Sequence, residues 1–476
     1  MHIHFIGIGG TAMGSVALAC LEQGHTVTGS DGPLYPPMST VLDAAGIERS
    51  EAFSAERLKE LRPDLVVIGN AISRGNPELE FVLEMRWPYT SMAALVGEQF
   101  ISRNHSIVCA GTHGKTTTTS ITAWLLESAE LSPGFLVGGV PGNFTVGCRP
   151  VPYGVHNTMT GVFVSEGDEY DTAFFDKRSK FVHYRPTVAI VNNVEFDHAD
   201  IFDSVDDIVR SFRHMIRLIP QSGVVLVNAD DSIAISTTTS APCPVETVGL
   251  SSQATWSIEN AEYTDGLQRF SLVKNGQAYG TFAFPMPGIH NVRNAAMAIA
   301  ATHRMGLTPE EQAEGLLRFL PPKRRLEKIG QWNGCTVVDD FAHHPTAIAA
   351  TIEALSQQYP TSRIHVVFEP RSNTTTRNFF QHELAHCFAG AASVYLGPVH
   401  RPERYSESER LDTEALLATL RTMGITSHSV PSHRSSDPAW GADVVPLLAD
   451  QVQQGDVVAI LSNGSVGGLR ALLTAQ

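Results

Sequence analysis

The chain has 476 residues, enough for about three domains that each bury a core of their own. Its formal net charge of −15 argues against a sequence-independent nucleic-acid binder, which needs a concentrated basic surface to displace counterions. Its six cysteines lie far apart and form no Cys-x-x-Cys pair, so the sequence indicates neither a zinc knuckle nor a disulfide framework.

The amino-terminal residues run directly into a strand. They contain no basic region, no small-residue cleavage site and no apolar run long enough to span a bilayer. We therefore expect a cytoplasmic protein with reduced thiols, without a membrane or nucleic-acid partner. The sequence also indicates no obligate protein partner.

The first segment has the pattern of a dinucleotide-binding βαβ unit. It predicts a strand at residues 2–6, a glycine-rich turn at 7–14, a helix at 15–23 and a strand at 25–29 that is followed by Asp31. Alone, this pattern favours a dehydrogenase. A further strand at 65–69 and a helix at 91–101 lead to a predicted domain boundary near Arg103.

A phosphate-binding loop follows the apolar run at residues 106–108. Gly111 and Gly114 allow successive backbone N–H groups to face one anion, Lys115 can reach the β/γ-phosphates, and the Thr116 hydroxyl is placed for Mg²⁺. The general motif has glycine where this chain has Cys109. A helix is predicted to follow at 119–129. The alternative is that this glycine-rich segment is only a turn before the helix and binds no ligand.

The remaining pattern predicts two more α/β units. Strands at 161–164, 188–192 and 223–228, with a helix at 204–219, predict a parallel sheet, and residues 256–284 predict hairpins at its edge. Helices at 291–304 and 308–318 precede a proline-rich linker at 321–325, and strands at 336–339, 364–368, 393–396 and 457–461 form the last unit. We therefore predict domains at 1–103, 104–320 and 321–476.

Carboxylates follow two strands of the middle segment. Glu166, Asp168, Glu169 and Asp171 come after the strand at 161–164, at the edge where a parallel sheet and a phosphate loop hold a divalent ion. We expect Glu166 to bind metal; the alternative for this run is a solvated acidic turn. The strand at 188–192 is followed by Glu195, Asp197 and His198, so His198 is a candidate second metal ligand.

Polar residues of the later segments point to nucleotide and anionic ligands. Asn291 and Asn294 lie three residues apart on a predicted helix, hence on one face, and their amides can donate to and accept from an adenine edge. Asp339 and His343 follow one strand of the last unit, and Arg371 and Asn373 follow another. The planar guanidinium of Arg371 suits a substrate carboxylate, although Arg371 and Arg325 are equally compatible with surface or interface positions.

Together these motifs resemble the Mur ligases, the ATP-dependent amide-forming enzymes of peptidoglycan precursor synthesis. The resemblance rests on the glycine turn at 7–14, Gly-Thr-His-Gly-Lys-Thr-Thr from 111, the acidic run from 166, Asp197-His198, Pro-Gly-Ile-His-Asn from 287 and Asp-Asp-Phe-Ala-His-His-Pro-Thr from 339. It implies an α/β fold of three domains: a Rossmann-like first domain, a central P-loop ATPase-type parallel sheet with an edge hairpin region, and a Rossmann-like last domain.

The strings at 35–40, 169–181 and 369–374 resemble the family member that joins UDP-N-acetylmuramate to L-Ala-γ-D-Glu-meso-diaminopimelate in peptidoglycan recycling. The resemblance implies phosphorylation of the lactyl carboxylate by ATP and attack of the peptide amine on the acyl phosphate. Some relatives carry a carbamylated lysine after the metal histidine, but residues 201–223 contain no lysine. The resemblance leaves open which group holds the second Mg²⁺ instead.

The resemblance also implies roles for residues at matching positions, with ATP and Mg²⁺ as cofactors. It implies that the catalytic residues are Lys115, Glu166 and His198, and that the metal ligands are Thr116, Glu166 and His198. The implied ATP-binding residues are Gly111, Thr112, His113, Gly114, Lys115, Thr116, Thr117, Asn291, Asn294, Arg325, Asp339 and His343. The UDP-sugar would contact Gly7, Gly9, Gly10, Thr11, Gly14 and Asp31, and the peptide would contact Arg371 and Asn373.

Three alternative functions remain. The nearest is the UDP-N-acetylmuramate:L-alanine ligase of the same family, which takes the amino acid in place of the peptide. A dehydrogenase would use the opening glycines but leaves the phosphate loop and acidic run unexplained. A UDP-sugar sensor would bind the nucleotide sugar without turning over ATP, which the presence of Lys115, Glu166 and His198 argues against.

Overall fold

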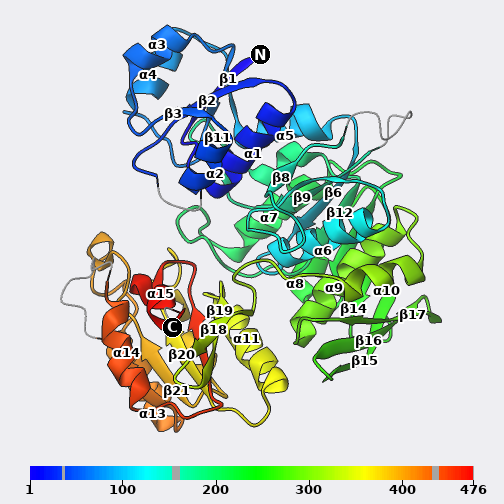
Figure 1. The fold of residues 1–476 in the computed structure, drawn as a ribbon. Helices are drawn as coiled ribbons and strands as arrows, with labels where there is room; N and C mark the ends of the chain where they lie inside the picture. The colour runs from blue at the N-terminus through cyan, green and yellow to red at the C-terminus, as the bar shows by residue number, and fades with distance from the viewer. Residues whose placement is uncertain (35–37, 153–160, 431–438, 475–476) are drawn as a thin grey trace.

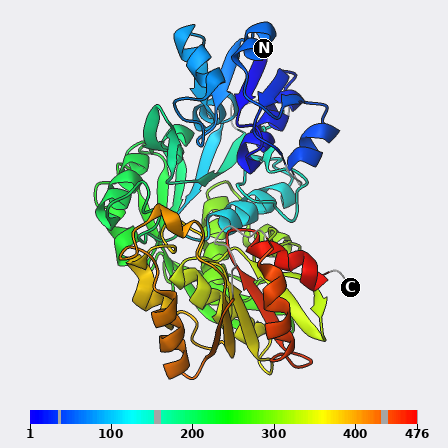
Figure 2. The same ribbon diagram turned by 90° about the vertical axis from the view of Figure 1, so that its left-hand side faces the viewer.

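The computed structural model describes residues 1–34, 38–152, 161–430 and 439–474, and it shows three main sheets with helices packed around them. The string predicted at 35–40 therefore lies partly outside the described residues. In Figures 1 and 2 the blue N-terminal part and the orange-to-red C-terminal part lie at opposite ends of the molecule, and the central part contacts both. No helix among the described residues is both long and apolar enough to cross a membrane.

The N-terminal sheet has five parallel strands in the order β3-β2-β1-β4-β5. Its strands are β1 (His2–Ile6), β2 (Thr26–Ser30), β3 (Glu48–Ser50), β4 (Leu65–Ile68) and β5 (Tyr89–Ser91). Its helices are α1 (Thr11–Glu22), α2 (Met38–Ala44), α3 (Ala55–Leu61), α4 (Pro77–Glu84) and α5 (Met92–Val96), which continues as a π-helical turn at Gly97–Ile101. After β3 the chain crosses to β4 on the other side of β1, so the strand order reverses at β1, where sheets of this type bind ligands at their carboxyl ends.

The central sheet has ten strands among the described residues, in the order β17-β16-β15-β14-β13-β12-β6-β9-β7-β8. Its strands are β6 (His105–Ala110), β7 (Gly134–Leu136), β8 (Cys148–Arg149), β9 (Val162–Gly167), β12 (Val188–Val191), β13 (Val224–Asn228), β14 (Val245–Gly249), β15 (Trp256–Thr264), β16 (Leu267–Lys274) and β17 (Gln277–Phe284). The pairs from β7 to β15 along this order are parallel, whereas the β7–β8, β15–β16 and β16–β17 pairs are antiparallel. A separate hairpin joins β10 (Asp171–Ala173) and β11 (Asp176–Ser179).

The predicted edge hairpins are confirmed. Both turns place two consecutive residues at positive φ, Asp265 and Gly266 in one and Asn275 and Gly276 in the other. This is the turn geometry that matches the twist of antiparallel strands, and Asp-Gly and Asn-Gly adopt it at little cost. The helices of the central part are α6 (Lys115–Ser128), α7 (Val205–Ile216), α8 (Ser232–Thr237), α9 (Ile289–His303) and α10 (Pro309–Leu317), with a 3₁₀ turn at Lys180–Tyr184.

The C-terminal sheet has six strands in the order β18-β19-β23-β20-β21-β22, all parallel except the β18–β19 pair. Its strands are β18 (Glu327–Trp332), β19 (Cys335–Asp340), β20 (Ile364–Phe368), β21 (Ser393–Leu396), β22 (Thr426–Ser429) and β23 (Val457–Leu461). Its helices are α11 (Pro345–Gln358), α12 (Gln381–His386), α13 (Thr413–Thr422), α14 (Gly441–Ala449) and α15 (Leu469–Thr474), with 3₁₀ turns at Asn378–Phe380, Pro402–Arg404 and Val466–Gly468. The predicted α/β class with a Rossmann-like unit at each end is confirmed.

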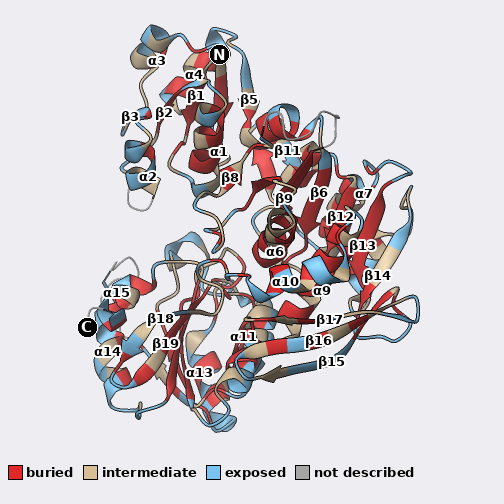
Figure 3. Ribbon diagram, turned by 45° about the vertical axis from the view of Figure 1, so that its right-hand side comes forward, coloured by how far each residue is buried: buried red, intermediate tan, exposed pale blue. Residues whose placement is uncertain are grey.

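The burial pattern explains how the parts are joined. Along β6, Ile107 and Cys109 face one apolar cluster while Val108 and Ala110 face another, as the two-residue period of a strand requires. The second of these clusters continues into the N-terminal sheet, so the first two parts share a core, whereas the C-terminal sheet is packed by two clusters of its own. Figure 3 shows the buried residues concentrated on the strands of each sheet.

Candidate active site

The loop after β6 has the backbone of an anion-binding turn. Gly111 and Gly114 have φ of 143° and 80°, conformations that glycine adopts without strain. A Cβ at Gly114 would lie 2.5 Å from the Asn294 side-chain oxygen, so space as well as conformation requires glycine there. The next residue, Lys115, begins α6, which no side chain caps, so the free N–H groups of the helix face this loop.

The predicted start of this helix at Thr119 is wrong by one turn. Gly114 turns the chain directly into the helix, and the hydroxyls of Thr119 and Ser120 donate to the carbonyls of Lys115 and Thr116, both at 2.8 Å. These bonds satisfy the hydroxyls within the helix. Similarly, α1 begins at Thr11 rather than at Ser15, so the opening turn is shorter than predicted.

The phosphate loop is fixed by the segment that follows β12. Asn193 accepts from the Thr112 N–H through its carbonyl at 3.1 Å and from the His113 N–H through its side chain at 2.7 Å. The Glu195 N–H donates to the Thr112 hydroxyl at 2.9 Å, and that hydroxyl donates to the Glu195 carbonyl at 3.2 Å. The loop is therefore held in shape by the protein itself.

A buried charge cluster surrounds Lys115. Its ammonium donates to both oxygens of Glu169, at 2.9 and 2.8 Å, and Glu169 also lies 3.1 Å from Nε2 of His198. Burial alone would lower the pKa of Lys115, but the charges of Glu169, Asp168 and Glu166 outweigh it and raise that pKa. Burial would raise the pKa of Glu169, and Lys115 and His198 more than offset this and lower it. At neutral pH the site thus holds a positive lysine beside ionised carboxylates.

His198 occupies an unusual backbone position. Its φ of 56° is left-handed, a conformation that costs a non-glycine residue free energy. Its N–H donates to Asp197 at 2.8 Å, which fixes the turn. Burial opposes protonation, yet the hydrogen bond that His198 makes to Glu169 and the charges of Glu169 and Asp197 raise the pKa of His198.

Thr116 and Glu166 lie together at the start of α6. The Thr116 hydroxyl donates to Glu166 at 3.0 Å, and the other carboxylate oxygen of Glu166 accepts from the Gly138 N–H at 2.7 Å. Arg325, the last residue of the predicted linker, donates to the same hydroxyl at 3.1 Å. Glu166 was expected just after its strand, but β9 pairs with β6 through Gly167, so Glu166 is the penultimate residue of that strand.

The two asparagines of α9 are neighbours as predicted. Asn294 donates to the Asn291 side chain at 3.3 Å and accepts from the Thr118 hydroxyl at 3.2 Å, while Asn291 donates to the Pro287 carbonyl at 2.8 Å. Both are buried, and Asn294 packs directly against the glycine that begins α6. Whether either contacts adenine stays a prediction.

The structure brings some predicted residues of the last domain to the site. Besides Arg325, His343 lies 3.9 Å from a carboxylate oxygen of Asp197. The carboxylate of Asp339 is instead paired within the C-terminal domain, 2.7 Å from Arg470. Arg371 lies 3.5 Å from Glu369.

The opening turn is organised around Asp31. Its carboxylate accepts from the N–H groups of Gly9 at 2.7 Å and Gly32 at 2.8 Å, so it shapes the turn. Gly7 has a φ of 88°, and α1 begins just beyond the turn. The N-terminus of α1 therefore follows the carboxyl end of β1, as a diphosphate-binding turn requires.

Sequence reasoning missed the contacts across the domain boundary. Thr374 donates to Asp197 at 2.7 Å, and His344 lies 3.2 Å from Glu195. It also missed Lys180, whose ammonium donates to Asp168 at 2.5 Å. The position of Glu195 and His344 beside predicted site residues was a signal, but no spacing in the sequence pairs them.

Comparisons with known proteins agree with this architecture. Three Mur ligase family models match the chain: the catalytic domain over residues 2–103, the middle domain over 109–302 and the glutamate ligase domain over 324–464.

The relatives carry the names of two different ligases, which differ in the substrate that is joined to UDP-N-acetylmuramate. UDP-N-acetylmuramate–L-alanyl-γ-D-glutamyl-meso-2,6-diaminoheptandioate ligase of Escherichia coli is 41% identical over 99% of this chain and 97% of the relative. UDP-N-acetylmuramate–L-alanine ligase of Acetivibrio thermocellus is 32% identical over 98% of this chain and 94% of the relative. A crystal structure of murein peptide ligase from Psychrobacter arcticus superposes with a TM-score of 0.72 at 36% identity, covering 100% of this chain and 98% of that one.

Proposed function

The chain belongs to the Mur ligase family, and on that premise we propose that it joins UDP-N-acetylmuramate to L-Ala-γ-D-Glu-meso-diaminopimelate, with ATP giving ADP and phosphate. The observation that carries the choice of substrate is the 41% identity, over nearly the full length of both chains, to the E. coli ligase named for this tripeptide. The L-alanine ligase of A. thermocellus is less similar, at 32% identity. A UDP-sugar sensor would not need the charged site around Lys115.

The proposed reaction requires activation of a carboxylate. A carboxylate does not react with an amine until one oxygen becomes a leaving group, and transfer of the γ-phosphoryl group from ATP supplies it as an acyl phosphate. This step gathers several negative oxygens, so catalysis depends on positive charge and positioning. We propose that Lys115 exchanges its Glu169 partner for the β/γ-phosphates when ATP binds, because a protonated lysine in a mainly buried site needs an anionic partner.

The residues near Thr116 suit Mg²⁺. The Thr116 hydroxyl and the Glu166 carboxylate are hard oxygen donors 3.0 Å apart, and Mg²⁺ prefers oxygen ligands. When bound, Mg²⁺ would neutralise charge on the phosphates. We propose His198 for a second ion, with Glu169 and Asp168, whose ligand atoms lie within 4.8 Å of one another, as its partners in place of the lysine that residues 201–223 lack.

We propose the other contacts by their place in the fold. The opening turn from Gly7 to Gly14, with Asp31, would hold the UDP diphosphate at the N-terminus of α1. The loop from Gly111 to Thr117, Asn291, Asn294, Arg325, Asp339 and His343 would contact ATP. Arg371 and Asn373 would bind a carboxylate of the peptide.

We also propose the domain limits 1–103, 104–320 and 321–476 and a cytoplasmic location, where ATP and UDP-sugars are made.

Water must be kept from an acyl phosphate, so the C-terminal domain is expected to close during turnover. The contacts of Arg325 with Thr116 and of Thr374 with Asp197 are those that such closure would form.

The test is phosphate release from ATP with Mg²⁺ and UDP-N-acetylmuramate, with the tripeptide or L-alanine as second substrate and product mass as confirmation. We expect turnover and the tripeptide product with the tripeptide alone. Turnover with L-alanine alone would reassign the substrate while keeping the ligase. Binding of UDP-N-acetylmuramate without turnover of either would overturn the proposal.

A further inference from the structure

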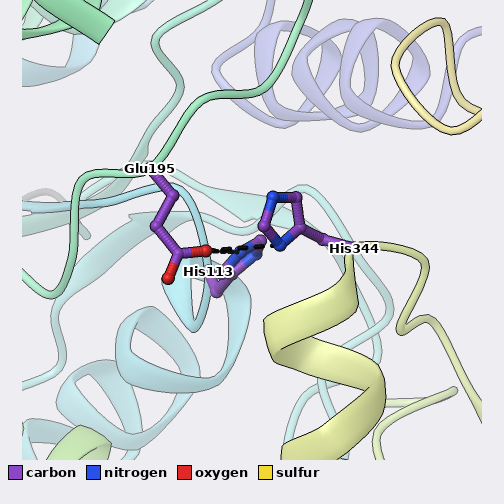
Figure 4. A group of neighbouring side chains, drawn as sticks. All are labelled: His113, Glu195 and His344. Atoms are coloured by element: carbon purple, nitrogen blue, oxygen red, sulfur yellow. Dashed lines mark hydrogen bonds and ion pairs between the residues drawn. The ribbon is translucent and has the colours of Figure 1, made fainter. Parts of the chain in front are cut away.

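A second group of charged side chains lies at the boundary between the central and C-terminal domains. It consists of His113 from the phosphate loop, Glu195 from the segment after β12, and His344 from the start of α11, and we call it the interdomain triad. Nε2 of His113 lies 3.0 Å from Oε2 of Glu195, and Nδ1 of His344 lies 3.2 Å from the same oxygen. Figure 4 shows the carboxylate directed at both imidazoles.

The hydrogen bonds of His344 determine which of its nitrogens carries the proton. Nε2 lies 3.3 Å from the Phe196 carbonyl, which can only accept, so Nε2 is the donor. Nδ1 accepts from the Thr346 N–H at 3.3 Å, so it carries a lone pair. Nδ1 also lies 3.2 Å from Oε2 of Glu195, which is likewise an acceptor.

Two acceptors 3.2 Å apart repel each other unless a positive charge lies between them. Nδ1 supplies no proton, because it accepts from the Thr346 N–H while Nε2 donates to the Phe196 carbonyl. The imidazole is therefore the neutral tautomer with its proton on Nε2. Nδ1 of His344, the carboxylate of Glu195 and a ring nitrogen of His113 offer ligand atoms within 4.8 Å of one another, and a metal bound there would take the Nδ1 lone pair from the Thr346 N–H.

We propose that the interdomain triad binds a divalent transition metal of the zinc class and thereby ties the phosphate loop to the C-terminal domain. Ligand atoms about 2.0–2.1 Å from a tetrahedral ion lie about 3.3 Å apart, close to the two distances found here. Two imidazoles and one carboxylate are a common zinc donor set, with the fourth position left to water. Mg²⁺, which prefers oxygen, is disfavoured.

The surroundings support the ligands in the way metal sites require. A ligating histidine donates its second ring N–H to a carbonyl or carboxylate, and His344 does so to Phe196. The other oxygen of Glu195 accepts from the Thr346 hydroxyl at 3.1 Å, which fixes the carboxylate. His113 is fixed through its backbone by Asn193.

The triad is separate from the residues proposed for Mg²⁺. None of its members is Thr116, Glu166 or His198, and Glu169 rather than Glu195 is the carboxylate that contacts His198. A metal at the triad would join two domains that must separate to release product. We therefore expect zinc-class ions to stabilise the closed arrangement and to slow turnover.

The test uses Co²⁺ as the probe, since its visible absorption reports a site of low coordination number with nitrogen ligands. Chelator-treated full-length protein would be titrated with Co²⁺ in excess Mg²⁺, without substrates. We expect one Co²⁺ per chain. Affinity should fall about 100-fold or more in Glu195→Gln and in His344→Asn, because loss of a ligand weakens binding at least as much as loss of a residue that hydrogen-bonds to a ligand. The matched controls are Glu166→Gln, which alters the proposed Mg²⁺ ligands, and His365→Asn, a buried histidine elsewhere.

A second readout is the thermal midpoint with and without Zn²⁺. We expect Zn²⁺ to raise it in the wild type and in His365→Asn but not in Glu195→Gln, and circular dichroism would show that each variant is folded. A Co²⁺ spectrum that survives both triad changes, or that is lost in Glu166→Gln alone, would overturn the proposal. Because no substrate is present, this result is independent of which reaction the enzyme catalyses.

Discussion

Replacing Glu169 by glutamine removes the anionic partner of Lys115 while keeping the shape of the side chain. Glu169 is 2% exposed and accepts both bonds from a lysine whose side chain is 14% exposed. Removing one partner of a fully buried pair costs about 3–5 kcal/mol, because the other charge is left uncompensated. Glutamine keeps one acceptor and water reaches the lysine, so we take about 2 kcal/mol as the expected loss.

This loss corresponds to a fall in the thermal midpoint of about 4–8 °C for a unit of about 200 residues. The assay is scanning calorimetry of Glu169→Gln and wild type, with and without a non-hydrolysable ATP analogue. We expect the difference to shrink with the analogue, because its phosphates would replace the lost carboxylate beside Lys115. Glu314→Gln, which breaks an exposed ion pair with Arg318 in α10, is the control and should change stability by less than about 0.5 kcal/mol. An unchanged midpoint without nucleotide, or a difference that the analogue does not reduce, would refute the reasoning.

Three further outcomes follow from the site and the fold. Arg325→Ala should lower kcat/KM for ATP by about tenfold or more with little change in midpoint, since it removes a charged contact to the nucleotide loop; equal kinetics would remove it from the site. Gly114→Ala should abolish ATP binding in isothermal titration, whereas Gly266→Ala, which has the same positive φ but open space, should cost only about 1 kcal/mol and keep activity. Burial would raise the pKa of Asp456, but hydrogen bonds, chiefly the one from Arg363, hold it at about 2, below the unfolded value of about 3.9. The ionised carboxylate therefore stabilises the fold fully above about pH 4, and this contribution is lost as the pH falls toward 2. Asp456→Asn should lower the thermal midpoint at pH 7 and reduce the fall of the midpoint between pH 4 and pH 2.

Much of the fold could be predicted because buried parallel strands have an unambiguous pattern. The predicted strand limits at 364–368, 393–396 and 457–461 agree with β20, β21 and β23, since each is a short apolar run with polar flanks. Helix starts were less accurate. A threonine run has low helix propensity, so the sequence pattern did not show that the left-handed Gly114 turns the chain into α6 at Lys115.

Contacts between site residues were predicted well within the central domain and poorly between domains. Lys115 and Thr116 follow β6, and Glu166 lies near the end of the neighbouring strand β9, so topology alone places them together. The partners Glu195 and His344 are almost 150 residues apart and belong to different domains. Their meeting depends on how two independently packed cores dock, which no periodicity of the sequence records.

The most direct test of the central claim is oxygen transfer from the sugar carboxylate. UDP-N-acetylmuramate with ¹⁸O in both lactyl carboxylate oxygens would be incubated with ATP, Mg²⁺ and L-Ala-γ-D-Glu-meso-diaminopimelate, and the phosphate and product examined by mass spectrometry. An acyl phosphate predicts one ¹⁸O in the released phosphate and one in the new amide. Unlabelled phosphate, or AMP that carries the label, would contradict the account.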